Sequence, residues 1–385
     1  MAPPASRLHH LDAARALLLL LGLPFHVATK AIYETQAGAV DFQQSLLISG
    51  WVSFTHTFRM FAFFLIAGYF AGMIRTRKGT RAWMVERARR LGLPFLASLF
   101  TLGALQFQLQ EVWLHKPSSG FLGLPFALDH LWFLLVLLAY CALYAMVPTR
   151  RIMPGERVRK AMLLAGPQSL ALMVLLAAWG LGRHLVELIP QSPDAATEVT
   201  LWHHFLFHSP AFVLGVVAWH AGIADRFFAL SSRWMVTGIV ILLALYLPFD
   251  PMLRPALGLE IFPDLAGALS LRASELPLAF LLSLALFRLL SLIVRGPSRI
   301  VALFVDGALA IYLFHLIWAM ILLPFVRAMP IPSEMQWMLA SAAVLLLALA
   351  SYLVMRASSL TAMLFCGVAP RPAHPSEPAI SHPAR

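Results

Sequence analysis

The chain has 385 residues, of which 60% are apolar and only 12% are charged. A soluble domain normally carries about 25% charged residues, so this composition excludes an ordinary water-soluble fold and favours one that is solvated by lipid. The formal net charge is +11, but the basic residues lie in short loops between apolar runs. This distribution predicts orientation in a membrane and argues against nucleic acid as the partner.

Spanning helices need about 20 mostly apolar residues, and about ten windows of the chain qualify. The first follows Arg7. It contains Pro24 and His26 and lacks a small-residue cleavage site, so we expect a retained helix and not a signal peptide. The predicted windows are 11–32, 47–73, 91–110, 129–147, 161–186, 203–222, 234–249, 275–294, 300–326 and 335–355. The segment 250–273 is expected to be a partly structured outer loop or a re-entrant piece.

The charge of the loops alternates along the chain. Segments 75–90 and 149–160 are rich in Arg and Lys, whereas 33–46 and 188–201 carry acidic residues and no Lys or Arg. The positive-inside rule then places both termini in the cytoplasm with an even number of spans. We expect an all-α polytopic integral membrane protein, a bundle of about ten transmembrane helices. Its two parts are a single transmembrane domain and a disordered Pro-rich C-terminal tail, at residues 1–368 and 369–385.

Ionisable residues inside predicted helices are costly in lipid and therefore mark candidate functional positions. Arg15 lies about one turn into the first helix, and His26 lies about 16 Å deeper at 1.5 Å per residue. His56 and Arg59 are one turn apart in the second helix and should share a face. Further polar or aromatic residues of other helices reach a similar depth, namely Asp129, His130, Trp132, His203, His204, His208, Tyr312 and His315. If the helices bundle, these residues line one polar cavity that opens outward.

Simpler roles remain open for these residues. An intramembrane histidine can be a packed, hydrogen-bonded residue, and the histidines and tryptophans near helix ends can belong to the interface. Asp12 can be a helix N-cap or a partner of Arg15 three residues later. The histidines lack HExxH or CxxC spacing, so no metal site is expected. Cys141 and Cys366 are expected to be inert, reduced thiols.

The basic segment 75–90 exceeds what orientation alone requires. Arg87 and Arg90 lie one turn apart at the mouth of the third helix, so both can face one phosphate group. The alternative is that these arginines serve only the topology of the chain.

Several motifs occur in order along residues 8–330. They are Leu11-Asp12-Ala13-Ala14-Arg15 followed by His26, Phe63-Phe64-Leu65-Ile66-Ala67-Gly68-Tyr69, Arg87-Ala88-Arg89-Arg90 followed by Pro94, His130-Leu131-Trp132-Phe133-Leu134, and Tyr312-Leu313-Phe314-His315. Together they resemble the membrane-bound acyltransferase 3 family, which usually has serine where this chain has Ala67. Leu21 to His26 and Phe58 to Met60 look most like its glucans biosynthesis protein C subgroup, which is associated with succinylation of osmoregulated periplasmic glucans.

The resemblance implies a membrane O-acyltransferase of the bacterial inner membrane. It would move an acetyl or succinyl group from cytoplasmic acyl-CoA to a hydroxyl of a periplasmic or envelope carbohydrate, such as an osmoregulated glucan. His26 is the expected general base, since an imidazole with a pKa of about 6.5 can accept a hydroxyl proton. The other assignments are Arg59 and His315 as catalytic residues, Arg15, Arg87 and Arg90 for acyl-CoA, and His56, His130, Trp132 and Tyr312 for the carbohydrate. No permanently bound cofactor and no metal are expected.

A secondary transporter of a small anionic or sugar-like solute is the alternative from another class. It is disfavoured because Asp12, Asp129 and Asp306 lie near predicted helix ends and no carboxylate chain crosses the bilayer. A pair formed at depth by Asp306 and Arg288 would revive it. A carbohydrate-binding sensor is a third possibility, and it would need no cytoplasmic arginine clamp. The sequence names neither the acyl group, the acceptor sugar nor the oligomeric state.

Overall fold

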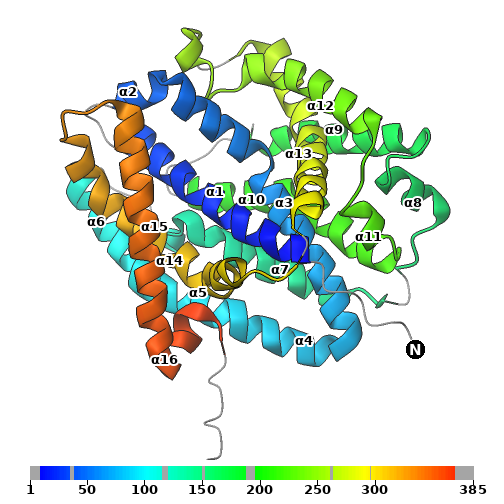
Figure 1. Ribbon diagram of the computed structural model, residues 1–385, viewed down its shortest axis with the longest axis horizontal. Coiled ribbons are helices and arrows are strands. Elements are labelled where there is room, and N and C mark those ends of the chain that lie inside the picture. Colours follow the sequence, from blue (N-terminus) through cyan, green and yellow to red (C-terminus); the bar gives the residue numbers. More distant parts are fainter. Residues whose placement is uncertain are drawn as a thin grey trace, which may run out of the picture.

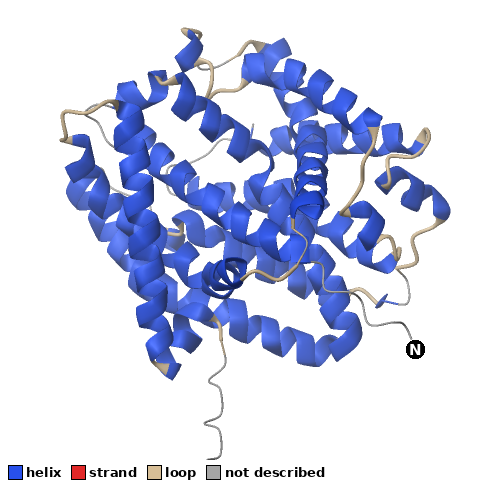
Figure 2. Cartoon of the chain, in the orientation of Figure 1, coloured by secondary structure: helices blue, strands red, loops and turns tan. Residues whose placement is uncertain are grey.

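The computed structural model describes residues 9–34, 39–114, 120–149, 152–187, 196–260, 263–294 and 296–368. Within these ranges the chain is helical and contains no strand (Figure 2). Eight helical segments are long and apolar enough to cross a membrane, and two shorter apolar helices fall in the fifth and seventh predicted windows. The protein is therefore an all-helical polytopic membrane bundle, as predicted. The count of ten spans, the side of the termini and the domain limits stay predictions, and the tail 369–385 lies outside the described residues.

The longer helices, in chain order, are α1 (His9–Glu34), α3 (Leu46–Lys78), α6 (Ala104–Leu114), α7 (Trp132–Met146), α9 (Gln168–Glu187), α10 (Ala196–His220), α12 (Arg233–Tyr246), α13 (Leu265–Ile293), α14 (Arg299–Arg327) and α15 (Ser333–Ala357). The shorter ones are α2 (Ala39–Gln44), α4 (Thr80–Arg87), α5 (Leu93–Ser98), α8 (Glu156–Met162), α11 (Ala224–Phe227) and α16 (Ser359–Thr361). The π-helical turns η1 (Ala88–Gly92) and η2 (Leu99–Gly103) join α4, α5 and α6. The short helix η4 (Asp129–Leu131) leads into α7.

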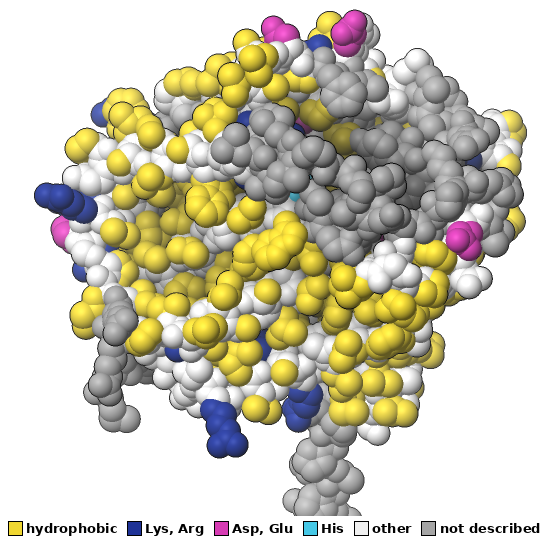
Figure 3. All heavy atoms as spheres, turned by 180° about the vertical axis from the view of Figure 1, so that it is seen from behind, with side chains coloured by type: hydrophobic (Ala, Val, Ile, Leu, Met, Phe, Trp, Pro, Cys, Tyr) yellow, Lys and Arg dark blue, Asp and Glu magenta, His cyan; other side chains and the backbone are white. Residues whose placement is uncertain are grey.

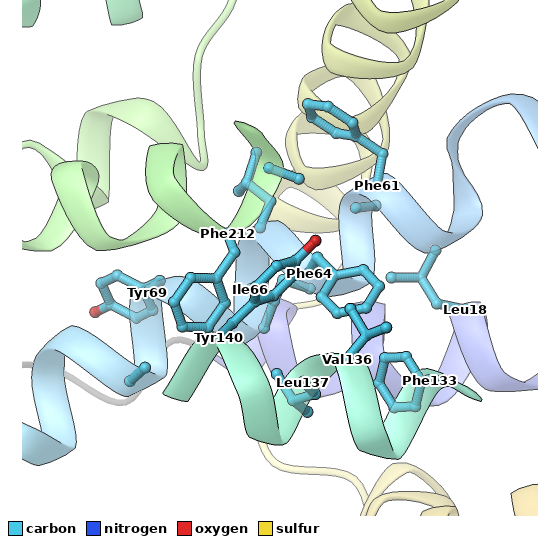
Figure 4. Packing of buried hydrophobic residues seen from close by; sticks show 14 of the residues in the cluster. Leu18, Phe61, Phe64, Ile66, Tyr69, Phe133, Val136, Leu137, Tyr140 and Phe212 are labelled. Atoms are coloured by element: carbon cyan, nitrogen blue, oxygen red, sulfur yellow. The ribbon is translucent and has the colours of Figure 1, made fainter. Parts of the chain in front are cut away.

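Helix α3 lies at the centre of the bundle, where it packs against α1, α10 and α13 (Figure 1). Its inward face carries aromatic side chains: the ring of Phe64 lies 5.1 Å from that of Phe133 and 5.4 Å from that of Tyr140. Figure 4 shows this cluster between α3, α7 and α10. Hydrophobic side chains are spread over much of the described part of the face seen in Figure 3, as expected where lipid takes the place of water.

The two ends of the bundle differ in charge. Figure 1 shows α4 and α16 at one end and α2 at the other. We call the first the arginine-rich end, because α4 and η1 carry Arg81, Arg87, Arg89 and Arg90. Helix α1 begins at His9 near this end and runs towards α2, so His26 lies in the half of α1 that is farther from the arginines.

Two glycines allow α3 and α10 to touch backbone to backbone. A Cβ atom on Gly68 would lie 2.0 Å from the carbonyl oxygen of Phe212, and one on Gly215 would lie 2.0 Å from that of Leu65. Membrane helices associate through such close packing, because burying apolar surface gains little when lipid is the solvent. Gly68 and Gly215 therefore set the distance between the two helices.

We expect Gly215→Ala to destabilise the folded protein by about 1–3 kcal/mol or more, because the added methyl group forces α3 and α10 apart. The measurement is thermal unfolding of the purified protein in detergent. Gly50→Ala is the matched control, since Gly50 lies in α3 and a Cβ atom there would have no neighbouring atom within 4 Å. It should be neutral or should stabilise the helix by up to about 1 kcal/mol. Equal melting temperatures for the two variants would contradict the close-contact interpretation.

Several predicted windows have wrong boundaries: the third begins at 91 although the helical segment begins at Thr80, and the sixth begins at 203 although α10 begins at Ala196. The fifth, 161–186, is two helices, because α8 ends at Met162 and Leu164 adopts a left-handed backbone with φ of 51° before α9 begins. The eighth, 275–294, begins too late: α13 starts after Asp264, whose side chain accepts a hydrogen bond from the amide of Gly267. Its first turns contain polar residues that lower the hydropathy. Glu275 consequently lies inside a helix and not at its edge.

Candidate active site

His26 and His315 lie next to each other in the centre of the bundle. Helix α1 carries His26 and α14 carries His315, and the centroids of the two rings are 5.0 Å apart. The ring of His26 is half-buried, and no described residue forms a hydrogen bond with it. Pro24, two residues earlier in α1, offers its carbonyl oxygen to the indole N–H of Trp337 at 2.9 Å, which ties α1 to α15. The imidazole of His26 is thus available for a hydrogen bond to a substrate, and the helix that carries it is held in place by α15.

His315 is buried and is oriented by its own helix. Its Nδ1 atom lies 2.6 Å from the carbonyl oxygen of Tyr312, so Nδ1 carries the proton and donates it to that oxygen. The other nitrogen, Nε2, then has a free lone pair, and it is buried without a hydrogen-bond partner among the described residues. Such an atom can accept a proton or a hydrogen bond from a group that enters the site.

His130 and Tyr312 contact each other beside the pair formed by His26 and His315. The hydroxyl of Tyr312 donates a hydrogen bond to the backbone carbonyl of His130. The ring nitrogens of His130 lie 3.3 Å from the carbonyl oxygen of Leu313 and 3.4 Å from Nε2 of Gln106. Because both nitrogens have protein partners, the geometry gives His130 and Tyr312 a positioning part. Their predicted contact with the carbohydrate stays a prediction.

Arg59 is buried next to the same site, with 6% of its surface exposed. Its guanidinium lies 4.3 Å from the centroid of the Phe25 ring, and its Nη1 atom has no hydrogen-bond partner among the described residues. Gly22 makes room for it, because a Cβ atom there would lie 3.3 Å from Nη1. His56 stacks on Phe25 at 5.5 Å, so His56 and Arg59 do share a face. No carboxylate of the described chain forms an ion pair with Arg59.

The remaining outer histidines, His203, His204 and His208, lie on α10. Trp132 stacks on His204 at 3.8 Å and on His208 at 5.5 Å. His203 lies 2.7 Å from the guanidinium of Arg183, which also forms an ion pair with Glu275. That these residues and those around His26 line one polar cavity stays a prediction.

Arg183, Glu275 and Lys30 are buried charged residues that the sequence analysis did not single out. The premise that no carboxylate lies inside the helices was wrong, because Glu275 lies ten residues into α13 and is 6% exposed. All three lie inside the predicted windows 11–32, 161–186 and 275–294, so a search for every acidic and basic residue within those windows would have found them. The pair of Asp306 and Arg288 that would have favoured a transporter is not formed among the described residues.

The arginine-rich end holds the residues predicted to bind acyl-CoA. Arg15 lies 3.8 Å from Asp12, which agrees with the second of the two simple roles open to Asp12, and 5.7 Å from the ring centroid of Phe70. Its charge is also close enough to interact with that of Arg87. Arg90 is exposed and forms an ion pair with Glu86 at 3.1 Å. Arg90 is thus tied to the surface of α4, and the contact of Arg15, Arg87 and Arg90 with acyl-CoA stays a prediction.

The described part of the chain also contains the side chains that could bind a metal or act as thiols. There, no three His, Cys, Asp or Glu side chains come together as metal ligands. Cys141 and Cys366 are both buried and unpaired. Burial raises the pKa of the Cys366 thiol, so this side chain stays protonated and unreactive near neutral pH.

A family model described as an acyltransferase domain matches residues 8–356, which is nearly the whole chain. The chain belongs to the acyltransferase 3 family. This membership confirms the resemblance that was drawn from the motifs of the first, second, third, fourth and ninth predicted helices. The family could therefore be predicted from the sequence.

The chain is similar to curated proteins named glucans biosynthesis protein C. Those of Salmonella heidelberg (strain SL476) and Salmonella typhi are each 30% identical to it over 261 residues, which are 63% of this chain. The matched part spans 66% of the length of these relatives. No solved structure matches the chain.

Proposed function

We propose that this member of the acyltransferase family transfers an acyl group from acyl-CoA to a hydroxyl group of a carbohydrate outside the bacterial inner membrane. The observation that carries the proposal is the ring of His26, which has no hydrogen-bond partner in the described chain and lies beside His315, whose Nε2 is buried and unpartnered. The buried cation of Arg59 lies against Phe25, the ring that precedes His26 in α1. Acyl transfer needs a base, charge stabilisation and exclusion of water. These residues supply all three within one group.

In the proposed reaction His26 accepts the proton of the sugar hydroxyl while the hydroxyl oxygen attacks the thioester carbonyl. The new C–O bond forms, the C–S bond breaks, and the proton passes from His26 to the sulfur of the departing CoA. Arg59 stabilises the oxyanion that forms between these steps. The unpartnered Nε2 of His315 can accept a hydrogen bond from the His26 ring during the reaction and so orient that ring. An intermediate with the acyl group on His26 is the other possible route.

The arginine-rich end supports acyl-CoA as the donor. Arg15, Arg87 and Arg90 can hold the phosphates of CoA, and the long pantetheine arm can then reach towards His26 between the helices. The acyl group is acetyl or succinyl. The relatives are named for glucan biosynthesis, which favours a periplasmic glucan as the acceptor.

We expect the double substitution Arg87→Ala, Arg90→Ala to raise the KM for acyl-CoA by about 10- to 100-fold, with little change in kcat, because charge-assisted hydrogen bonds to the phosphates are lost. The measurement is initial rate against acyl-CoA concentration. The double variant Arg157→Ala, Arg159→Ala removes the same charge from the exposed helix α8 and serves as the control. An unchanged KM in the first variant would remove the phosphate-binding role.

The test of the whole proposal is release of free thiol from acetyl-CoA or succinyl-CoA by the purified protein, with and without periplasmic glucan. Release that depends on glucan and is lost in His26→Ala would establish the activity and name the donor. A folded protein that releases no thiol from either donor would contradict it.

The buried pair of Arg183 and Glu275 favours transport as the second candidate function, because embedded carboxylates are common in transporters. A transporter would move a small anionic or sugar-like solute into vesicles. Uptake that survives His26→Ala and is lost in Glu275→Gln would favour transport over acyl transfer.

A further inference from the structure

Asp129 and His130, in the short helix η4, are held by partners from two other helices. The ammonium group of Lys30 in α1 lies 3.1 Å from Oδ2 of Asp129, and the same oxygen accepts a hydrogen bond from Nε2 of Gln110 at 2.8 Å. One turn away on α6, Gln106 lies 3.4 Å from Nδ1 of His130. Two glutamines on one face of α6 therefore fix two consecutive residues of the chain.

The backbone of Asp129 is strained. Its φ angle is +22°, a conformation that residues with a side chain rarely adopt because Cβ crowds the neighbouring carbonyl group. Lys30 is buried, with 8% of its surface exposed, and a buried ammonium is costly unless an opposite charge is beside it. The ion pair between Lys30 and Asp129 compensates the buried charge of the lysine, and it also holds the backbone of Asp129 in the strained conformation. Strain of this kind is often kept where a side chain must be placed accurately.

Hydrogen bonds and a ring contact connect η4 to the candidate catalytic residue His315. The carbonyl of His130 accepts the hydrogen bond from the hydroxyl of Tyr312, and the carbonyl of Tyr312 accepts one from Nδ1 of His315 at 2.6 Å. The His130 ring also lies 5.2 Å from that of His315, edge to face. A shift of η4 would therefore move the ring that lies beside His26.

We propose that Asp129 is a positioning residue for acyl transfer: its ion pair with Lys30 holds η4 so that His130 and Tyr312 place the ring of His315 against His26. This inference rests on the proposed function. It assigns parts to Asp129 and Lys30, which lie outside the group of side chains expected to touch the substrates.

The test is Asp129→Asn in the full-length enzyme, assayed by thiol release. Asparagine has the size of aspartate and tolerates positive φ, so the change removes the charge without adding strain. A displacement of about 1 Å near the reacting groups lowers a rate by about 100-fold, and we expect a loss of that size in kcat with the KM for acyl-CoA changed by less than about twofold. Lys30→Met removes the same ion pair from the other side and should give the same loss, and it keeps the test decisive if Asp129→Asn does not fold. Lys30→Arg keeps the charge and should restore most of the rate.

A double-mutant cycle separates positioning from a general loss of stability. Tyr312→Phe removes only the hydroxyl that reaches His130. Suppose that Asp129 acts through the hydrogen bond from the Tyr312 hydroxyl to the His130 carbonyl. The double variant Asp129→Asn, Tyr312→Phe should then lose about as much rate as the more damaging single change, because each substitution already removes the effect of that hydrogen bond. Glu334→Gln is the control, since Glu334 accepts a hydrogen bond from Ser45 at 2.5 Å and lies in α15 outside this network.

Two outcomes would overturn the inference while the wild-type enzyme is active: an unchanged kcat in folded Asp129→Asn protein, or losses in the cycle that multiply. A raised KM for the donor with unchanged kcat would also overturn it, since Asp129 would then act in binding. A wild-type protein that is inactive with both donors would instead refute the proposed function itself, so the two failures are distinguishable.

Discussion

Replacing His26 by alanine is expected to lower the kcat of acyl transfer by about 10²- to 10⁴-fold, the range that general bases contribute. The reason is geometric. His26 is the half-buried ring of the central group that has no hydrogen-bond partner in the described chain, so a substrate hydroxyl can occupy that place. The measurement is thiol release at saturating acyl-CoA and glucan.

His9→Ala is the matched control for this prediction. His9 is the first residue of the same helix, about 25 Å from His26 at 1.5 Å per residue, so it tests the loss of a histidine from α1 without touching the site. It should keep at least half of the wild-type rate. If His26→Ala kept its activity while its melting temperature matched the wild type, His26 would not be the base and His315 would become the candidate.

Replacing Arg59 by methionine is expected to reduce kcat by about 10²- to 10³-fold, as the loss of an oxyanion-stabilising donor does. Arg59 is a buried cation that lacks a carboxylate partner in the described part of the chain. A charge of this kind is costly in a membrane helix, and an anion formed or bound during the reaction would offset the cost. Methionine fills a similar volume without the charge, so the packing against Phe25 and Gly22 is largely kept.

Comparison of two donors separates two roles for Arg59. If it stabilises the oxyanion, Arg59→Met should reduce the rates with acetyl-CoA and succinyl-CoA by similar factors. If it binds the second carboxylate of a succinyl group, the loss should be much larger with succinyl-CoA and should appear mainly in KM. Arg288→Met removes a half-buried arginine elsewhere in the bundle and should change neither rate by more than about twofold. Wild-type kinetics in Arg59→Met with both donors would remove Arg59 from the mechanism.

Much of the architecture was predictable because lipid imposes a local rule on the chain. Every backbone group must be hydrogen-bonded inside the bilayer, so long apolar windows become helices whatever their neighbours are. The windows for α3, α14 and α15 were accurate to within a few residues. Prediction of helices from apolar windows failed where polar residues form ion pairs or hydrogen bonds inside the bundle. The first turns of α13 were assigned to a loop and Glu275 to the end of a helix, because hydropathy alone does not register the ion pair between Glu275 and Arg183.

The sequence by itself determined the membrane class, the family and the kinds of side chain that the chemistry needs, because each of these depends on composition or on spacing along one helix. It also placed His56 and Arg59 on one face, since a helix repeats every 3.6 residues. Only the tertiary structure decided which helices meet. Helix rotation and crossing bring His26 to His315 and Lys30 to Asp129, and they turn Trp132 towards His204 and His208. These contacts join residues far apart in the chain, and spacing along one helix carries no information about them.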